Sequence, residues 1–182
     1  MRLVKGITFF LVTVLLAGCA QSQSGFRAGS KVHADAFIQA NYQAADSLQR
    51  QLGMSVEKPT LLMATLVNID ALDRSSTLGR LVSEQVSARF TQGGYRMVEM
   101  KFQNSVYMAR GQGELMLTRE VHELASNYSA QAVIVGTYGE SKEYVFINLK
   151  VVEPESNHIL SVHDYSLPID ENVRLMLRNR RY

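Results

Sequence analysis

Residues 60–100 read TLLMATLVNIDALDRSSTLGRLVSEQVSARFTQGGYRMVEM and decide the fold of this chain. The run 61–67 is apolar on both of its alternating faces, which is typical of a strand buried by helices on either side. After a polar turn, a helical stripe predicts a helix that Gly93 and Gly94 end; its inward residues are Leu78, Leu81, Val82, Val86 and Phe90. A second strand is predicted over 95–100. A strand, a helix and a strand in this order predict a crossover unit with parallel strands.

The segments on either side extend this unit into one α/β domain. Upstream, residues 32–52 predict a helix that stops at Gly53, with an inward stripe of Ile38, Tyr42, Ala45, Leu48 and Leu52. Downstream, residues 101–113 have no clear period, and a third helix is predicted from Thr118 with Leu117, Val121, Leu124, Ala125 and Tyr128 inward.

The C-terminal third predicts strands joined by a hairpin. Residues 132–138 are fully apolar, whereas 143–152 alternate between apolar and polar, as in a strand with one buried face. Turn residues at 154–157 lead into a hairpin partner over 159–167. The predicted fold class is therefore α/β, a single compact domain with a mixed sheet of about five strands and helices packed on it. Residues 170–182 are basic and are expected to form a short helix or a loose tail.

The N-terminus predicts a secretory signal over 1–18, because basic residues precede a short apolar stretch that is too short to span a bilayer comfortably. It ends in Leu-Ala-Gly-Cys, and this motif resembles the lipobox of bacterial lipoproteins. That resemblance implies that Cys19 receives a diacylglycerol and, at its new amino end, an acyl chain such as palmitate. Residues 19–31 then form the lipidated cysteine and a flexible tether. Ala20 stands where aspartate is associated with inner-membrane retention, which favours the outer membrane.

The charge and the cysteine content exclude some functions and a disulfide-linked fold. Without Arg2 and Lys5, the 19 Lys and Arg residues fall to 17, which equals the 17 Asp and Glu residues. A neutral mature chain argues against nucleic-acid binding, which needs a basic surplus. Cys19 is the only cysteine, so the folded part has no internal disulfide.

Four strings resemble the FlgO family of flagellar outer-membrane lipoproteins, in the family's order and spacing. They are VNID with STLGR (67–70 and 76–80), GYRMVE (94–99), GELMLTRE (113–120) and AVIVGTY (132–138). Together they cover residues 61 to about 167, within an FlgO-like α/β domain predicted over 32–169. The resemblance implies a non-enzymatic lipoprotein that supports flagella, outer-membrane ring structures and motility, with ring or basal-body proteins as partners. The domain also resembles the α/β unit of the TolB amino-terminal and curli-secretion lipoprotein group.

The sequence contains none of the metal-binding or catalytic motifs that we considered. His33, His122, His158 and His163 do not pair at metal-ligand spacing. The acidic turn 68–76 lacks the glycine and glutamate of a calcium loop, so we expect its acids and serines to cap the following helix. A GxSxG nucleophile elbow is also missing. The sequence therefore predicts no enzyme, no catalytic residue, no metal and no cofactor.

Two features predict partner binding. Tyr144, Phe146 and Tyr165 lie in the predicted hairpin, where an exposed aromatic face or a free edge would suit a partner protein. Arg174, Arg178, Arg180 and Arg181 form a basic cluster that would suit an acidic neighbour. Two alternatives to the flagellar role stay open: a binding module that regulates a cell-wall synthase, and a secretion-channel subunit resembling the curli exporter. Oligomer formation is also open.

Overall fold

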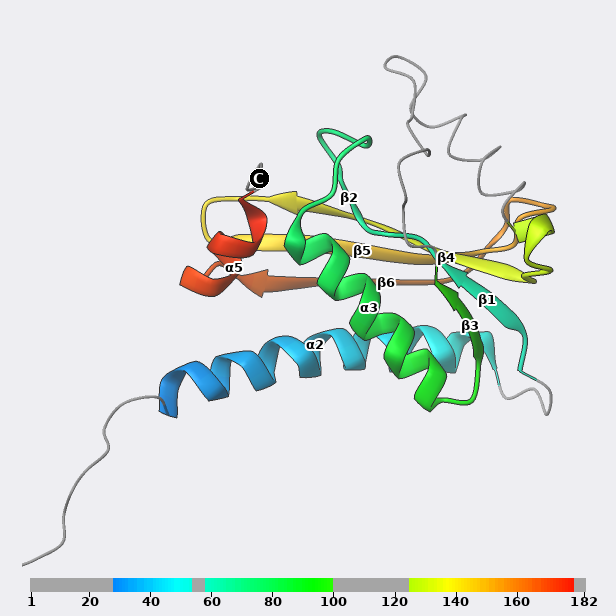
Figure 1. Cartoon of the computed structure of the whole chain (residues 1–182), viewed down its shortest axis with the longest axis horizontal. Helices are drawn as coiled ribbons and strands as arrows, with labels where there is room; N and C mark the ends of the chain where they lie inside the picture. The colour runs from blue at the N-terminus through cyan, green and yellow to red at the C-terminus, as the bar shows by residue number, and fades with distance from the viewer. Residues whose placement is uncertain (1–27, 54–57, 100–124, 179–182) are drawn as a thin grey trace, which may run out of the picture. The chain divides into compact units, whose positions relative to one another are not determined.

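The computed structural model describes residues 28–53, 58–99 and 125–178 (Figure 1). The elements in chain order are α2 (Ala28–Leu52), β1 (Thr60–Met63), β2 (Val67–Asn68), α3 (Thr77–Gln92), β3 (Arg96–Glu99), β4 (Ala132–Glu140), β5 (Tyr144–Val152), β6 (Ile159–Pro168) and α5 (Glu171–Leu177). Residues 125–127 are also helical. The predictions for residues 1–27, including the signal and Cys19, lie outside the described residues. So do those for 101–113 and for the start of a helix at Thr118.

The strands form one mixed sheet in the order β3-β1-β4-β5-β6, with β2 paired to β4. β1 runs parallel to both β3 and β4, whereas β5 runs antiparallel to β4 and β6. The parallel pairing of β1 and β3 around α3 confirms the predicted crossover unit. The antiparallel β5–β6 pair confirms the predicted hairpin. The chain therefore folds as a single α/β domain with a mixed sheet, as the sequence predicts.

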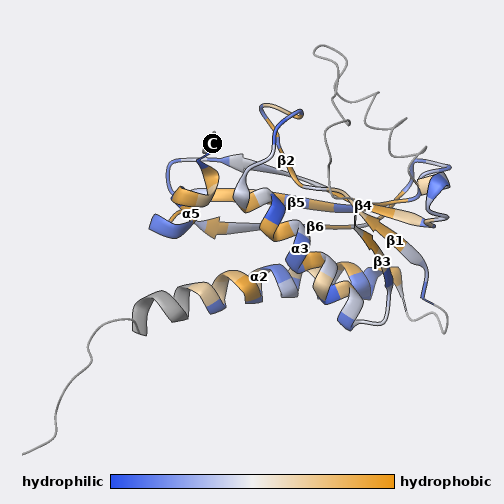
Figure 2. Ribbon diagram, viewed as in Figure 1, coloured by the Kyte–Doolittle hydropathy of each residue, from blue (hydrophilic) through white to orange (hydrophobic). Residues whose placement is uncertain are grey.

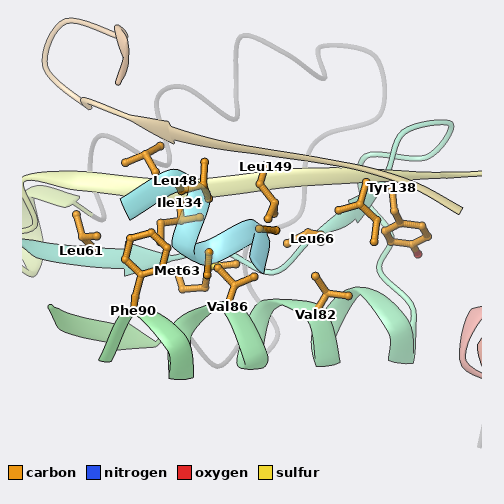
Figure 3. Packing of buried hydrophobic residues seen from close by; sticks show 14 of the residues in the cluster. Leu48, Leu61, Met63, Leu66, Val82, Val86, Phe90, Ile134, Tyr138 and Leu149 are labelled. Carbon is orange, nitrogen blue, oxygen red and sulfur yellow. The ribbon is translucent and has the colours of Figure 1, made fainter. Parts of the chain in front are cut away.

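The main core lies on the sheet face that α2 and α3 cover, which we call the inner face. Leu78, Val82, Val86 and Phe90 of α3 are fully buried there, as the sequence predicts. Figure 3 shows the α3 side chains pointing towards those of β1 and β4. The strands supply the alternating residues Val145, Ile147, Leu149 and Val151 of β5. Figure 2 shows the matching hydrophobic colours along β1 and on one side of α3.

The predicted strand 61–67 is divided in two by a bulge, which corrects the sequence prediction. Leu61 pairs with Ala132, but Val67 pairs with Thr137, so the β1–β2 segment contains one more residue than the facing stretch of β4. The Ser83 hydroxyl of α3 satisfies the backbone at this bulge, because it accepts from the Leu66 amide at 2.9 Å. Such bulges bend a strand locally.

Two further expectations need correction. α2 begins at Ala28, so the last residues of the predicted tether 19–31 belong to this helix. Its most buried residues are Asn41, Ala44, Ala45 and Leu48, a stripe rotated from the predicted one, and Tyr42 is only partly buried. Tyr128 was expected inward, but 51% of its surface is exposed because it follows the end of the helical turn at 125–127.

None of the helices that the structure describes is long and apolar enough to cross a membrane.

Candidate partner-binding surface

The outer face of the sheet, opposite α2 and α3, carries the exposed aromatic residues of the hairpin. Gly139 of β4 pairs with Phe146 of β5, which pairs in turn with Ser166 of β6. The Ile69 amide donates to the Tyr138 carbonyl at 2.9 Å, which continues the β2 register to Gly139. These pairings place Gly139, Phe146 and Ser166 in one row across β4, β5 and β6, with Ile69, the residue after β2, beside Gly139.

Three large side chains of this region are exposed, and we call Ile69, Tyr144 and Phe146 the hairpin patch. Their exposed fractions are 58%, 45% and 57%. The Tyr144 and Phe146 rings lie 6.5 Å apart between centroids. A Cβ atom at Gly139 would lie 3.2 Å from Ile69 Cγ2, so a bare glycine backbone separates Ile69 from Phe146. Adjoining exposed apolar side chains of this kind are typical of interaction sites.

A second exposed apolar group lies at the opposite end of β6. It contains Ile159, Leu160 and Val162, next to a register shift at Val151 and Val152. Between the two groups the outer face is polar, because the Asn148 amide donates to the Asp164 carboxylate. The hairpin patch is therefore separate from this second apolar group.

Tyr165 does not belong to the hairpin patch. It pairs with Ile147, whose side chain is buried on the inner face, so Tyr165 points towards α2. Its hydroxyl donates to Oδ1 of the fully buried Asn41, and burial raises the Tyr165 pKa well above its ordinary value. The prediction that aromatic hairpin residues lie on the exposed face applies to Tyr144 and Phe146 only.

The polar chain around Tyr165 has no sequence motif. Asn41 Nδ2 donates to Gln85 Oε1 at 2.6 Å, so α2, α3 and β6 are joined through three side chains. Tyr165 and Asn41 are 124 positions apart in sequence. No local sequence pattern links the two residues. The one sequence signal is that Asn41 is a polar residue on the buried side of α2.

The predicted basic cluster is described only in part. α5 is capped by Asp170, whose carboxylate accepts from the Val173 amide at 2.8 Å. Arg174 and Arg178 are exposed on and after this helix. Arg180 and Arg181 lie outside the described residues, so the predicted cluster as a whole stays a prediction.

Several exposed charged residues are close to the hairpin patch in sequence. Asp70 follows Ile69, and Glu143 precedes Tyr144. Glu140 follows Gly139 but pairs with Val145, which is buried on the inner face, so Glu140 lies on the opposite face of the sheet from Phe146. Asp164 lies on the outer face two residues before Ser166, and Lys142 lies in the turn between β4 and β5. All five are exposed, and four of them are acidic.

The other candidate residues, those for a metal site and those of the turn 68–76, have structural roles or do not cluster in the described part of the chain. Within the described ranges, no group of three or more His, Cys, Asp or Glu residues could hold a metal ion. Ser76 caps α3 by accepting from the Gly79 amide at 3.2 Å, as the sequence predicts. Ser75 instead donates to the Leu66 carbonyl at 2.6 Å. Asp70 belongs to an Asx turn, in which its backbone amide donates to Asn68 Oδ1.

A family model for the FlgO protein matches residues 42–172, from α2 to α5, and so includes every described strand. The chain belongs to the FlgO family. No curated protein sequence matches it.

Three solved structures are similar at low identity. The LpoB C-terminal domain from Salmonella enterica is 10% identical, with a TM-score of 0.49 over 68% of this chain and 94% of that chain. The same domain from Escherichia coli is 9% identical, with a TM-score of 0.49 and coverage of 70% and 97%. The PelC dodecamer from Paraburkholderia phytofirmans is 9% identical, with a TM-score of 0.43 and coverage of 63% and 74%.

Proposed function

We propose that this protein is a non-enzymatic lipoprotein of the outer membrane that supports flagellum assembly, outer-membrane ring structure and motility. The observation that carries this proposal is the FlgO family match over residues 42–172. The Leu-Ala-Gly-Cys motif before Ala20 supports the anchor, with Cys19 as the lipidated residue.

In this proposal the acylated cysteine holds the chain on the membrane and the domain binds proteins. A single acyl chain gives only marginal membrane binding, whereas two or more give a stable anchor. Residues 20–27 precede α2 and would reach roughly 28 Å if fully extended, at about 3.5 Å per residue. The domain can thus act at a short distance from the lipid surface.

The hairpin patch is the surface we propose for contact with ring or basal-body proteins. Tyr144 and Phe146 are exposed on a well-paired strand, and Ile69 directly follows β2, where its amide donates to the Tyr138 carbonyl, so these side chains start from a hydrogen-bonded backbone. Preorganised aromatic side chains lose little conformational entropy on binding. The tail around Arg178, Arg180 and Arg181 is a second proposed contact.

The test is deletion of the gene, followed by complementation with the wild-type gene, a Cys19→Ser variant or a Phe146→Ser variant. We expect deletion to reduce swimming and the number of flagella, and only the wild-type gene to restore both. The wild-type protein is also expected to co-purify with isolated hook–basal bodies. Normal flagellation and swimming after deletion would contradict the proposal.

A further inference from the structure

We infer that the outer edge of β6 binds an extended segment of a partner protein, which pairs antiparallel to β6 and carries a basic residue opposite Asp164. This inference rests on the proposed function, because it names a further contact of the protein-binding domain and the chemistry of its partner. Three observations carry it: the outward backbone groups of β6, the Gln51 amide bound to one pair of them, and the charge of Asp164.

β6 is the last strand on one side of the sheet, so half of its backbone groups face no other strand (Figure 1). The amide and carbonyl of Val162 are among these, because both bind the side chain of Gln51. Backbone groups alternate in direction along a strand, and the pairing of β6 with β5 is regular from Val162 to the C-terminal end of the strand. Asp164 and Ser166 therefore present their amides and carbonyls to the same free side as Val162.

This free edge has a defined length. A register shift at Val151 and Val152 of β5 interrupts the regular pairing at one end. At the other end, Pro168 has no amide hydrogen, and its carbonyl accepts from the Asp170 amide at 3.1 Å. The edge available for strand pairing therefore runs from Val162 to Ser166, and it suits a partner segment of similar length.

α2 leaves room beside this edge. Strand side chains stand roughly perpendicular to the sheet, and Tyr165 reaches Asn41 of α2 from the inner face. At this level α2 therefore lies over the inner face rather than in line with the sheet. Val162, Asp164 and Ser166 are all exposed. A further strand can thus lie next to β6 in the plane of the sheet.

The Gln51 amide stands in for one residue of the added strand. Its Nε2 donates to the Val162 carbonyl, and its Oε1 accepts from the Val162 amide. In an antiparallel pair a single residue makes both of these bonds, whereas in a parallel pair they go to two different residues. The edge therefore already binds an amide in the antiparallel manner. Because Gln51 is itself exposed, a partner segment can reach and displace it.

Asp164 selects the charge of the partner segment. β6 contains one acidic residue, Asp164, and no lysine or arginine. The Asp164 carboxylate lies on the outer face, where it accepts from Asn148 Nδ2. Lys150 lies on the same face but one strand further from the edge, opposite Val162. Opposite charges on directly paired residues stabilise a strand pair, so lysine or arginine opposite Asp164 would complement this edge.

The same residue disfavours a second copy of this chain as the occupant. A two-fold contact between two β6 edges is antiparallel. The register that uses Val162, Asp164 and Ser166 of both copies places the two Asp164 side chains directly opposite each other. Like charges in this position destabilise a strand pair. Two copies therefore pair more weakly than β6 and a complementary segment.

The test uses full-length protein in detergent and three fluorescein-labelled heptapeptides. The first has a central lysine with valine on either side, and threonine and serine beyond. In the second, glutamate replaces the lysine; in the third, a methyl group on the backbone nitrogen of the lysine removes the donor to β6. Fluorescence anisotropy gives Kd for each peptide. We expect the lysine peptide to bind at least about tenfold more tightly than the other two.

Variants of β6 assign the binding to its edge. Ser166→Pro removes an outward amide hydrogen without breaking a bond to β5, so we expect it to weaken binding of the lysine peptide at least about tenfold. Ser166→Ala is the matched control, because it keeps the backbone amide, and it should leave Kd unchanged. Asp164→Lys is expected to reverse the preference between the lysine and glutamate peptides. Thermal melts followed by circular dichroism verify that each variant folds.

A variant of α2 tests the competition by Gln51. Gln51→Ala removes the competing amide, so a larger fraction of the protein has a free edge, and we expect the lysine peptide to bind at least about threefold more tightly. Gln43→Ala, at another exposed glutamine of α2, should leave Kd unchanged. Both variants are measured at protein concentrations at which sedimentation velocity shows monomers.

Several results would overturn the inference. Equal binding of the N-methylated peptide, or unchanged binding by Ser166→Pro, would show that the β6 backbone is not recognised. Equal binding of the glutamate peptide would show that Asp164 does not select the partner, and unchanged binding by Gln51→Ala would show that Gln51 does not compete. Self-association of the wild-type protein that Ser166→Pro abolishes would identify a second copy as the occupant.

The same measurements separate this inference from the proposed function. If deletion of the gene leaves swimming normal but the lysine peptide binds as expected, the proposed function fails and the β6 site stands. If deletion reduces swimming but the wild-type protein does not bind the lysine peptide, the proposed function stands and the β6 site is wrong.

Discussion

The side-chain amide of Gln51 binds the backbone of Val162 through two hydrogen bonds. Gln51 Nε2 donates to the Val162 carbonyl at 2.9 Å, and the Val162 amide donates to Gln51 Oε1 at 3.2 Å. A residue of an added strand would bind the same two groups in the same way. Since β6 is an edge of the sheet, α2 thereby protects a strand that could otherwise pair with another chain.

Substitution of Gln51 by alanine is expected to expose this edge. Loss of two partly solvated hydrogen bonds should lower the free energy of unfolding by about 1 kcal/mol. Self-association should also increase, because the Val162 amide and carbonyl become available for strand pairing. Guanidinium denaturation and sedimentation velocity measure the two effects.

Gln43→Ala is the matched control for this prediction. Gln43 is an exposed glutamine of α2, so its substitution should change neither the free energy of unfolding by more than about 0.5 kcal/mol nor the oligomeric state. If Gln51→Ala sediments as the wild type does and unfolds at the same denaturant concentration, Gln51 has no protective role.

The polar contact between Tyr165 and Asn41 gives a second prediction. Tyr165→Phe removes the donor to Asn41 Oδ1, and Asn41 is fully buried. An unsatisfied buried acceptor costs about 1–3 kcal/mol, so we expect a loss of that size in the free energy of unfolding. Chemical denaturation of the variant measures it.

A double-mutant cycle distinguishes this contact from general packing. If the hydrogen bond matters, Asn41→Leu and Tyr165→Phe together should cost less than the sum of the two single substitutions, by roughly 0.5 kcal/mol or more. Tyr144→Phe serves as the control, because Tyr144 lies on the exposed face. Strict additivity of the two substitutions would argue against coupling between α2 and β6 through this pair.

The sequence predicts those features of the fold that follow from local periodicity. The alternation in 143–152 predicts β5 and its buried face correctly, because a strand repeats every two residues. The stripe in α3 and the glycines after it likewise predict the helix and its end. These signals are local, so they do not depend on which strands pair.

Features that depend on pairing register could not be predicted. The faces of Phe146 and Tyr165 follow from the pairing of Ile147 with Tyr165, which a register shift near the β5–β6 turn helps to set. The bulge in the predicted strand 61–67 depends on Ser83, which lies in a different element. Of the candidate site, Tyr144 and Phe146 were found by their type and position, whereas Ile69 needed the pairing of β2 with β4.

Two glycines of β4 give a third prediction with a built-in control. A Cβ atom at Gly136 would lie 2.7 Å from the Asn148 carbonyl and 3.0 Å from Leu66 Cγ, both in the packed interior. Gly136→Ala should therefore lower the free energy of unfolding by about 1–3 kcal/mol, as overpacking does. The equivalent atom at Gly139 meets only the Ile69 methyl at 3.2 Å, and Ile69 is exposed.

Gly139→Ala is accordingly expected to change the free energy of unfolding by no more than about 0.5 kcal/mol. Thermal or denaturant unfolding of the two alanine variants, side by side, checks the difference. Equal losses at both positions would mean that the strand needs glycine for its backbone rather than for close packing at Gly136.

Alkaline pH gives the last prediction, because burial raises the pKa of Tyr165 above its ordinary value. In the unfolded chain a tyrosine ionises near pH 10, whereas the folded protein keeps the Tyr165 proton at higher pH. Above about pH 10 the unfolded state therefore binds fewer protons than the folded state, so stability falls as pH rises. The contribution of Tyr165 is complete below about pH 10 and is lost above it, by up to about 1.4 kcal/mol per pH unit.

Tyr165→Phe removes this contribution to the pH dependence. Urea denaturation between about pH 8 and 11 should show a shallower alkaline decline for Tyr165→Phe than for the wild type. Tyr138 also has a pKa raised mainly by burial, but it is present in both proteins and its effect cancels in the comparison. Parallel curves for the wild type and Tyr165→Phe would mean that the hydroxyl bound to Asn41 ionises as readily in the folded protein as in water.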